Sequence, residues 1–143
     1  MRIRTLKPEW LTSPSVARLS DSARLLSAGL VLMADDAGRG IAELETIVAE
    51  VWRHHAGPAS CAETYRKATG ALRELSDHGF VVLYEVSGVT YFELPNFRKH
   101  QVINKPTASK LPSPKEAESH HSSQIPEPSR SAPEPLPDEI GRA

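Results

Sequence analysis

The chain has 143 residues, 24% of them charged, and a formal net charge of −1. This length suits one small domain, and the balanced charge excludes a domain that is basic over its whole surface. The single cysteine, Cys61, excludes an internal disulfide framework, so we expect a cytoplasmic protein. The apolar stretch at residues 25–34 is too short to cross a bilayer, and no membrane partner is expected.

The first part of the chain predicts a basic arm followed by two helices. Residues 2–12 form the arm, and one short helical turn is expected at residues 15–19. A longer helix is predicted at residues 20–34, where Ser20 or Asp21 supplies the cap. Its apolar side is expected to contain Leu25, Leu26, Leu30 and Met33.

The middle of the chain predicts a turn, a short strand and a helix. Residues 35–40 are rich in turn-forming residues, and residues 41–42 are expected to add a short strand against a later hairpin. A helix is predicted at residues 43–52, followed by a turn at residues 53–59. The shared face of this helix is expected to contain Leu44, Ile47, Val48, Val51 and Trp52.

The longest predicted helix covers residues 62–78. Ser60 is expected to cap its start, and Gly79 is expected to take the left-handed conformation at its end. Apolar and small residues recur at steps of three and four along it, which predicts one buried face. That predicted face contains Tyr65, Ala68, Thr69, Leu72 and Leu75.

Two strands follow the long helix and complete the predicted fold. Residues 80–84 and 90–94 are β-branched and aromatic, and Ser87-Gly88 between them indicates a hairpin turn. Short helices, then a long helix that leads into a hairpin, are typical of a winged helix-turn-helix. We therefore predict an α+β domain of three to four helices with a hairpin wing at residues 1–95, in which the long helix enters a DNA groove.

The charge distribution predicts two further segments after this domain. Residues 1–93 contain 10 basic and 12 acidic residues, whereas residues 94–111 contain four basic residues and no acidic one. We assign residues 96–111 to a basic connector. Residues 112–143 contain seven of the 12 prolines and no aromatic residue, so we expect a disordered, acidic, Pro/Ser-rich tail.

The polar side of the long helix is the first candidate DNA-binding surface. Arg66, Lys67 and Arg73 lie on it, and the N-terminal part of a recognition helix is the part that approaches the bases. Any amphipathic helix also has a mixed-charge solvent face, and this alternative stays open. The predicted hairpin tip contains no Lys or Arg, so we expect the hairpin to cover the core rather than to bind phosphate.

The connector and the arm supply the other candidates. Arg98, Lys99 and Lys105 are expected to bind phosphates, with Phe97 stacking on an unpaired base or, alternatively, docking on the domain. Arg2 and Arg4 are expected either to lie in an adjacent DNA groove or to remain at the surface while the apolar arm residues pack on the core. Those apolar residues are Ile3, Leu6 and Trp10.

No metal site, cofactor site or catalytic site is predicted. His54, His55 and Cys61 match no recurring spacing of zinc ligands. Asp35-Asp36 precedes a glycine-rich turn, where aspartate is favoured by its side-chain hydrogen bonds. No phosphate-binding loop or nucleophile motif is present, so an enzyme is not expected.

Four separated segments of the chain resemble a family of phage and prophage proteins of actinobacterial type. They are the opening residues 2–10, the turn at residues 34–39, the hairpin residues 84–88, and residues 94–106. This family is described as winged-helix replication-initiation proteins, also called replisome-organiser or DnaD-like proteins. The likeness covers about residues 2–112, and here the acidic tail stands where larger members have a second helical domain.

The resemblance implies a DNA-binding protein that acts in phage or prophage replication initiation. Double-stranded DNA is the expected partner, with single-stranded DNA and a replicative helicase or helicase loader as further partners. Two alternatives remain open, namely a winged-helix transcriptional regulator and an adaptor that docks a helicase or single-strand-binding protein without binding DNA. The sequence leaves the oligomeric state open.

Overall fold

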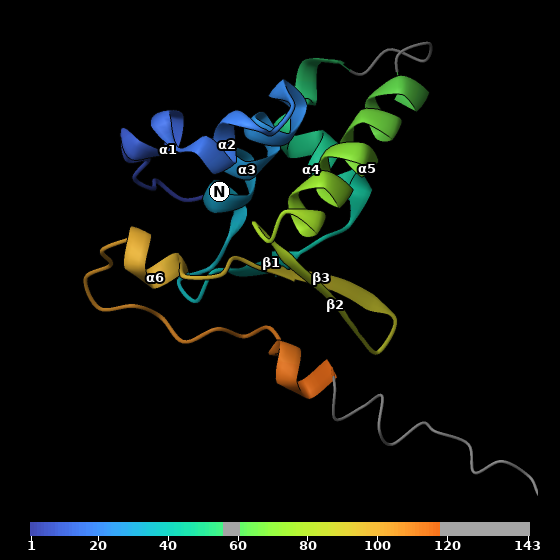
Figure 1. The fold of residues 1–143 in the computed structure, drawn as a ribbon. Coiled ribbons are helices and arrows are strands. Elements are labelled where there is room, and N and C mark those ends of the chain that lie inside the picture. The colour runs from blue at the N-terminus through green and yellow to red at the C-terminus, as the bar shows by residue number, and fades with distance from the viewer. Residues whose placement is uncertain (56–60, 118–143) are drawn as a thin grey trace, which may run out of the picture.

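Helices pack against one face of a three-stranded antiparallel sheet in the computed structural model, which describes residues 1–55 and 61–117 (Figure 1). The predicted cap at Ser60, most of the predicted turn at 53–59 and most of the predicted tail lie outside these residues. The labelled helices are α1 (Glu9–Thr12), α2 (Pro14–Ala17), α3 (Asp21–Met33), α4 (Leu44–Val51), the 3-10 turn η1 (Arg53–His55), α5 (Cys61–Asp77) and α6 (Phe97–His100). Residues 114–117, at the start of the predicted disordered tail, are also helical. The strands are β1 (Arg39–Ile41), β2 (Val82–Val86) and β3 (Val89–Glu93).

The three long helices form where the sequence predicts them. The side chain of Ser20 accepts a hydrogen bond from the backbone N–H of Ala23, which caps α3. Gly79 has a φ of 76° and ends α5, because glycine adopts the left-handed conformation without a steric cost. Helices α3 and α5 pack directly against each other, and α4 packs on α5.

The buried face of α5 differs from the predicted one. The buried residues are Thr64, Ala68, Ala71, Leu72 and Leu75. Tyr65 is only partly buried, at the edge of the core, and Thr69 bonds back to the Tyr65 carbonyl. The structure buries Thr64 and Ala71 where the prediction had Tyr65 and Thr69, so the buried face is turned around the helix axis relative to the predicted one. On α3 the prediction was also wrong for Leu25, which is 48% exposed.

The sheet has the strand order β1-β3-β2. Val86 pairs with Val89 across the two-residue turn, whose residues Ser87 and Gly88 have φ angles of 52° and 79°, as a tight hairpin requires. The predicted short strand near residues 41–42 is β1, which pairs with β3 from Arg39 to Ile41. Strand β2 starts two residues later than predicted, because the N–H of Phe80 still donates to the carbonyl of Leu75 at the helix end.

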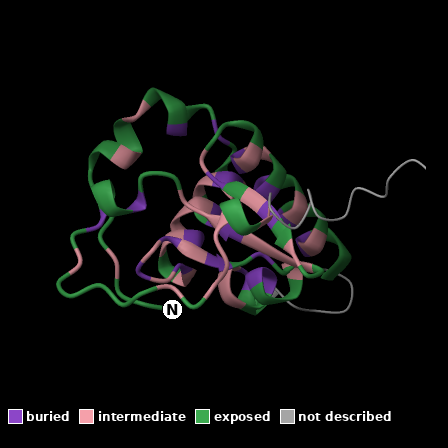
Figure 2. Cartoon of the chain, turned by 90° about the horizontal axis from the view of Figure 1, so that it is seen from below, coloured by how far each residue is buried: buried purple, intermediate pink, exposed green. Residues whose placement is uncertain are grey.

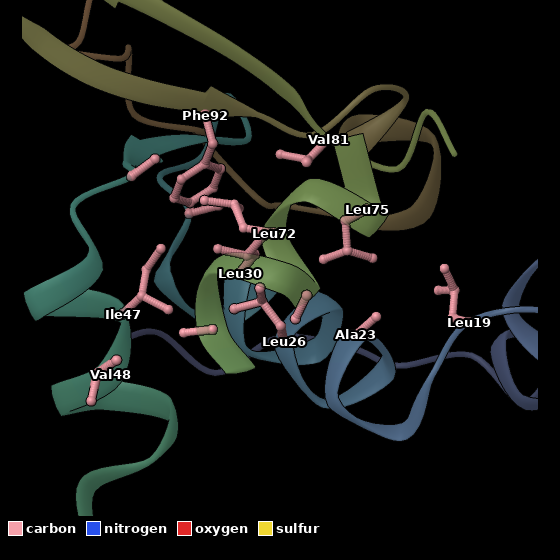
Figure 3. Close-up of a cluster of buried hydrophobic side chains, with 14 of the residues drawn as sticks. Leu19, Ala23, Leu26, Leu30, Ile47, Val48, Leu72, Leu75, Val81 and Phe92 are labelled. Atoms are coloured by element: carbon pink, nitrogen blue, oxygen red, sulfur yellow. The ribbon is translucent and has the colours of Figure 1, made fainter. Parts of the chain in front are cut away.

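The core lies between the sheet and the three long helices (Figure 3). Phe92 points from β3 into the helical layer and is completely buried, as are Leu26 and Leu30 of α3, Ile47 of α4 and Leu75 of α5. Figure 2 shows buried residues gathered where these elements meet, while the outer segments are mostly exposed. Within residues 1–55 and 61–117, no helix has the length and apolar character needed to cross a bilayer.

The residues after β3 return to the domain and cross the sheet on the side away from the helices (Figure 1). The N–H of Thr107 donates to Asp36, Arg39 donates to the carbonyl of Leu111, and the hydroxyl of Tyr84 donates to the carbonyl of Pro112. The last part of the segment predicted as a connector, residues 107–111, is therefore attached to β1 and to the turn that precedes it. The sequence analysis did not predict this attachment.

Candidate nucleic-acid interface

The outward side of α5 carries three exposed cations. Arg66 and Arg73 are seven residues apart, which places them on the same side of an α-helix, and Lys67 lies beside Arg66. All three are exposed, and within the described residues none of their side chains forms an ion pair or hydrogen bond. This side of the helix is therefore available to an anionic partner.

One acidic residue of this helix, Glu74, is held by another element. The carboxylate of Glu74 accepts hydrogen bonds from the backbone N–H and the hydroxyl of Ser20, each 2.7 Å long. These two bonds lower the pKa of Glu74. Glu74 therefore joins the end of α5 to the start of α3, and its charge is directed towards the N-terminus of α3 rather than towards the cations.

The hairpin contributes no cation to this surface. The segment 82–93 contains no Lys or Arg, and Glu85 is exposed near its tip. Instead, the rings of Tyr84 and Tyr91 stack across the two strands with their centroids 5.7 Å apart. Burial raises the pKa of Tyr84 to about 12. The hairpin thus has one face on the core and an aromatic pair beneath the returning chain.

The cations of the connector lie elsewhere on the molecule. Arg98 and Lys99 are exposed on α6, and Lys105, with a φ of 52°, is exposed farther along. Figure 1 shows α6 and the N-terminal half of α5 on opposite sides of the ribbon. The structure does not bring these two predicted groups of DNA-binding residues together.

Phe97 is a packing residue in this structure. Its side chain is 5% exposed and lies against Gly38, where an added Cβ would be 2.6 Å from the Cβ of Phe97. The guanidinium of Arg4 lies 5.2 Å from the ring centroid, within the range of a cation–π interaction. Of the two interpretations of Phe97, the structure has the one in which it docks on the domain.

The N-terminal arm is held by an ionic cluster that the sequence did not reveal. Arg2 and Arg4 both donate to Oδ1 of Asp36, at 2.6 and 3.2 Å, and Arg4 also donates to the carbonyl of Ala34. The side chain of Arg4 is 6% exposed, so it is not part of the outer basic surface, whereas that of Arg2 is 51% exposed.

The expectation that the apolar residues of the arm pack on the core was wrong for two of the three. Ile3 is 101% and Leu6 is 51% exposed, and only Trp10 is partly buried. The reason is that the buried Asp36 carboxylate attracts the guanidinium groups, which orient the arm by hydrogen bonds. A backbone-like pair of bonds between Thr5 and the side-chain amide of Gln101 fixes it further.

The turn at residues 34–39 binds the chain that returns after β3 through both Asp35 and Asp36. The hydrogen bond from the N–H of Thr107 is the largest cause of the lowered pKa of Asp36. Burial raises this pKa, but the hydrogen bonds from Arg2 and Arg4 lower it further, and the result is a pKa of about 2. Asp35 accepts from the N–H groups of Ala37 and Arg39 and from the hydroxyl of Ser109. The only sequence signal for this role was the Asp-Asp pair in a turn.

Candidate metal ligands do not converge in the part of the chain that the structure describes. No group of three His, Cys, Asp or Glu side chains there is arranged to hold an ion, and His54 and Cys61 are exposed.

Comparison of the chain with protein-family models, with curated proteins and with solved structures found no match.

Proposed function

We propose that this chain is a winged-helix protein that binds double-stranded DNA through α5. The observation that carries the proposal is the outward side of α5, where Arg66, Lys67 and Arg73 are exposed and have no partner among the described residues. This side of α5 has positive charge at the place where a recognition helix contacts phosphates and base edges.

The order of the elements supports the winged-helix assignment. Helix α3 is followed by β1, then by the helix pair α4 and α5, and then by the hairpin β2-β3. The short strand β1 pairs with β3 and closes the sheet beside the helix pair. In a helix-turn-helix the second helix of the pair enters the major groove, and here that helix is α5.

The assignment to phage or prophage replication initiation rests on the resemblance of residues 2–112 to replisome-organiser proteins. It adds a biological setting to the DNA binding and requires a further partner, a replicative helicase or its loader. A transcriptional regulator with the same fold would require a dimer that matches two half-sites. The oligomeric state in solution separates these two roles.

The test is binding of the full chain to a labelled DNA duplex across a series of salt concentrations. If the three α5 cations each contact a phosphate, the logarithm of the affinity should fall with the logarithm of salt concentration with a slope of about −2.7. The Arg66→Glu, Lys67→Glu double variant should lose this binding. The matched control is Arg98→Glu, Lys99→Glu, which makes the same change of charge on α6 and should keep most of the affinity.

Two outcomes would contradict the proposal. Absence of salt-sensitive binding by the unmodified chain would remove the DNA-binding function altogether. Equal loss in both double variants would show that charge in general, rather than α5, determines the affinity.

A second candidate function is an adaptor that docks a helicase or single-strand-binding protein. The hairpin favours it, since segment 82–93 has no Lys or Arg to contact phosphate. This function predicts that the α5 double variant keeps its DNA affinity and loses its protein partner.

A further inference from the structure

Gly70 occupies a position where glycine is unfavourable for the fold. It lies in the interior of the 17-residue helix α5 and is exposed. Apart from proline, glycine is the residue that destabilises a helix interior most, because it loses the most backbone freedom on folding. The presence of glycine at position 70 therefore needs an explanation.

Packing within the chain does not supply that reason. A Cβ built on Gly70 meets no heavy atom within 4 Å of the described structure. Gly29 of α3 shows the contrast, because its Cβ would lie 2.7 Å from Cγ2 of Val51. Gly70 is also absent from the residues with a positive φ. As far as the described chain is concerned, alanine would fit at position 70 and would stabilise the helix.

The neighbours of Gly70 on the helix surface are mostly cations. Positions three and four residues away are adjacent on an α-helix, and for Gly70 they are Arg66, Lys67, Arg73 and Glu74. The three cations are exposed and unpaired among the described residues, while the Glu74 carboxylate is held by Ser20. Gly70 is thus a bare stretch of helix backbone with basic side chains on three sides.

We propose that Gly70 is the point of closest approach between α5 and the sugar–phosphate backbone of duplex DNA. This inference rests on the proposed function and deepens it by naming the contact. Without a side chain at position 70, a DNA strand can lie against the helix backbone while Arg66, Lys67 and Arg73 reach phosphates on both sides of it. A side chain at this position would occupy the space through which the strand approaches the helix backbone.

The test is a size series at position 70, Gly70→Ala and Gly70→Leu, in the full chain. Both substitutions should raise the melting temperature, by about 3–6 °C for alanine, because both residues have high helix propensity. Affinity for a labelled duplex of mixed sequence should fall with side-chain size, by about tenfold for leucine, which is the worth of one charge-assisted hydrogen bond. The control is Ser76→Leu, about 120° around the same helix from Gly70.

The combination of a more stable fold and weaker binding is what the inference expects, and unfolding cannot produce it. Undiminished binding by Gly70→Leu, with the unmodified chain binding normally, would overturn the inference and leave the proposed function intact. Equal weakening by Ser76→Leu would also overturn it. Failure of the unmodified chain to bind any duplex would remove the proposed function, and the inference with it.

Discussion

Replacing Phe97 by alanine separates a packing role from a nucleic-acid role. The sequence allowed Phe97 either to stack on an unpaired base or to dock on the domain. In the structure its side chain is 5% exposed, packs on Gly38, and lies under the guanidinium of Arg4. We expect Phe97→Ala to destabilise the folded chain strongly, because the substitution removes the packing that attaches both α6 and the N-terminal arm.

The magnitude follows from burial and from the Arg4 contact. Truncating a buried phenylalanine to alanine costs about 3–5 kcal/mol of unfolding free energy. The lost cation–π interaction adds about 0.5–1 kcal/mol. Because α6 is a single short turn that can settle into the space left behind, we expect a total at the lower end of this sum, about 3.5 kcal/mol, which lowers the melting temperature by about 14 °C.

The assay is thermal unfolding followed by circular dichroism, together with binding of a labelled single-stranded oligonucleotide well below the melting temperature. Val102→Ala is the control, because Val102 lies in the same segment and is 98% exposed, and it should change the unfolding free energy by less than about 0.5 kcal/mol. The reasoning would be refuted if Phe97→Ala melted like the control and lost about 1–3 kcal/mol of single-strand binding, which is the signature of a base-stacking residue.

Three further substitutions test the fold around the proposed surface. Gly40→Ala should cost about 1–3 kcal/mol in urea unfolding, because its Cβ would lie 2.4 Å from the Phe92 ring; an unchanged urea midpoint would contradict the packing of β1 on β3. The pKa of Asp36 falls from 3.8 to about 2 on folding, so its stabilising contribution is complete above about pH 4 and is lost as the pH falls through about 2. Asp36→Asn should abolish that part of the acid dependence, and identical acid unfolding curves for the variant and the unmodified chain would disprove the ionic cluster. Ser20→Ala should cost about 1 kcal/mol by removing the α3 cap, whereas Ser22→Ala, at a position with no side-chain hydrogen bond among the described residues, should cost little.

The elements that the sequence predicted well are those with a local signal. Helix α5 repeats its apolar positions over 17 residues, and the hairpin places Ser87-Gly88 between two β-branched and aromatic runs. The four-residue helices α1 and α6 were missed, because little more than one helical turn contains no periodicity to detect.

The attachment of the arm and the connector was missed for a different reason. The bond from Thr107 to Asp36 joins residues 71 apart in sequence, and the pair between Thr5 and Gln101 spans 96 residues. Apart from the Asp-Asp pair in its turn, none of these four residues has a sequence signal that indicates its partner. The apolar residues of the arm predicted that they would pack on the core. Instead, hydrogen bonds to the carboxylate of Asp36, more than 30 residues away, orient the arm.

The near-neutral charge of the chain is weak evidence against DNA binding once the acidic residues are located. Asp36 is paired with Arg2 and Arg4 of the arm, Glu93 is paired with Arg39 at 2.8 Å, and Glu74 is held by the start of α3. Exposed charges interact appreciably over only about 8 Å at physiological salt, so a DNA strand at α5 responds to the charges beside it and hardly to the total. Glu63 and Asp77, both exposed on α5, are neighbours of the outermost cations, three or four residues from Arg66 and Lys67 and four residues from Arg73, while the positions between them on this side carry the three cations. A strand that crosses the helix near its middle therefore meets positive charge, and the position of that crossing, rather than the net charge, is the quantity that determines binding.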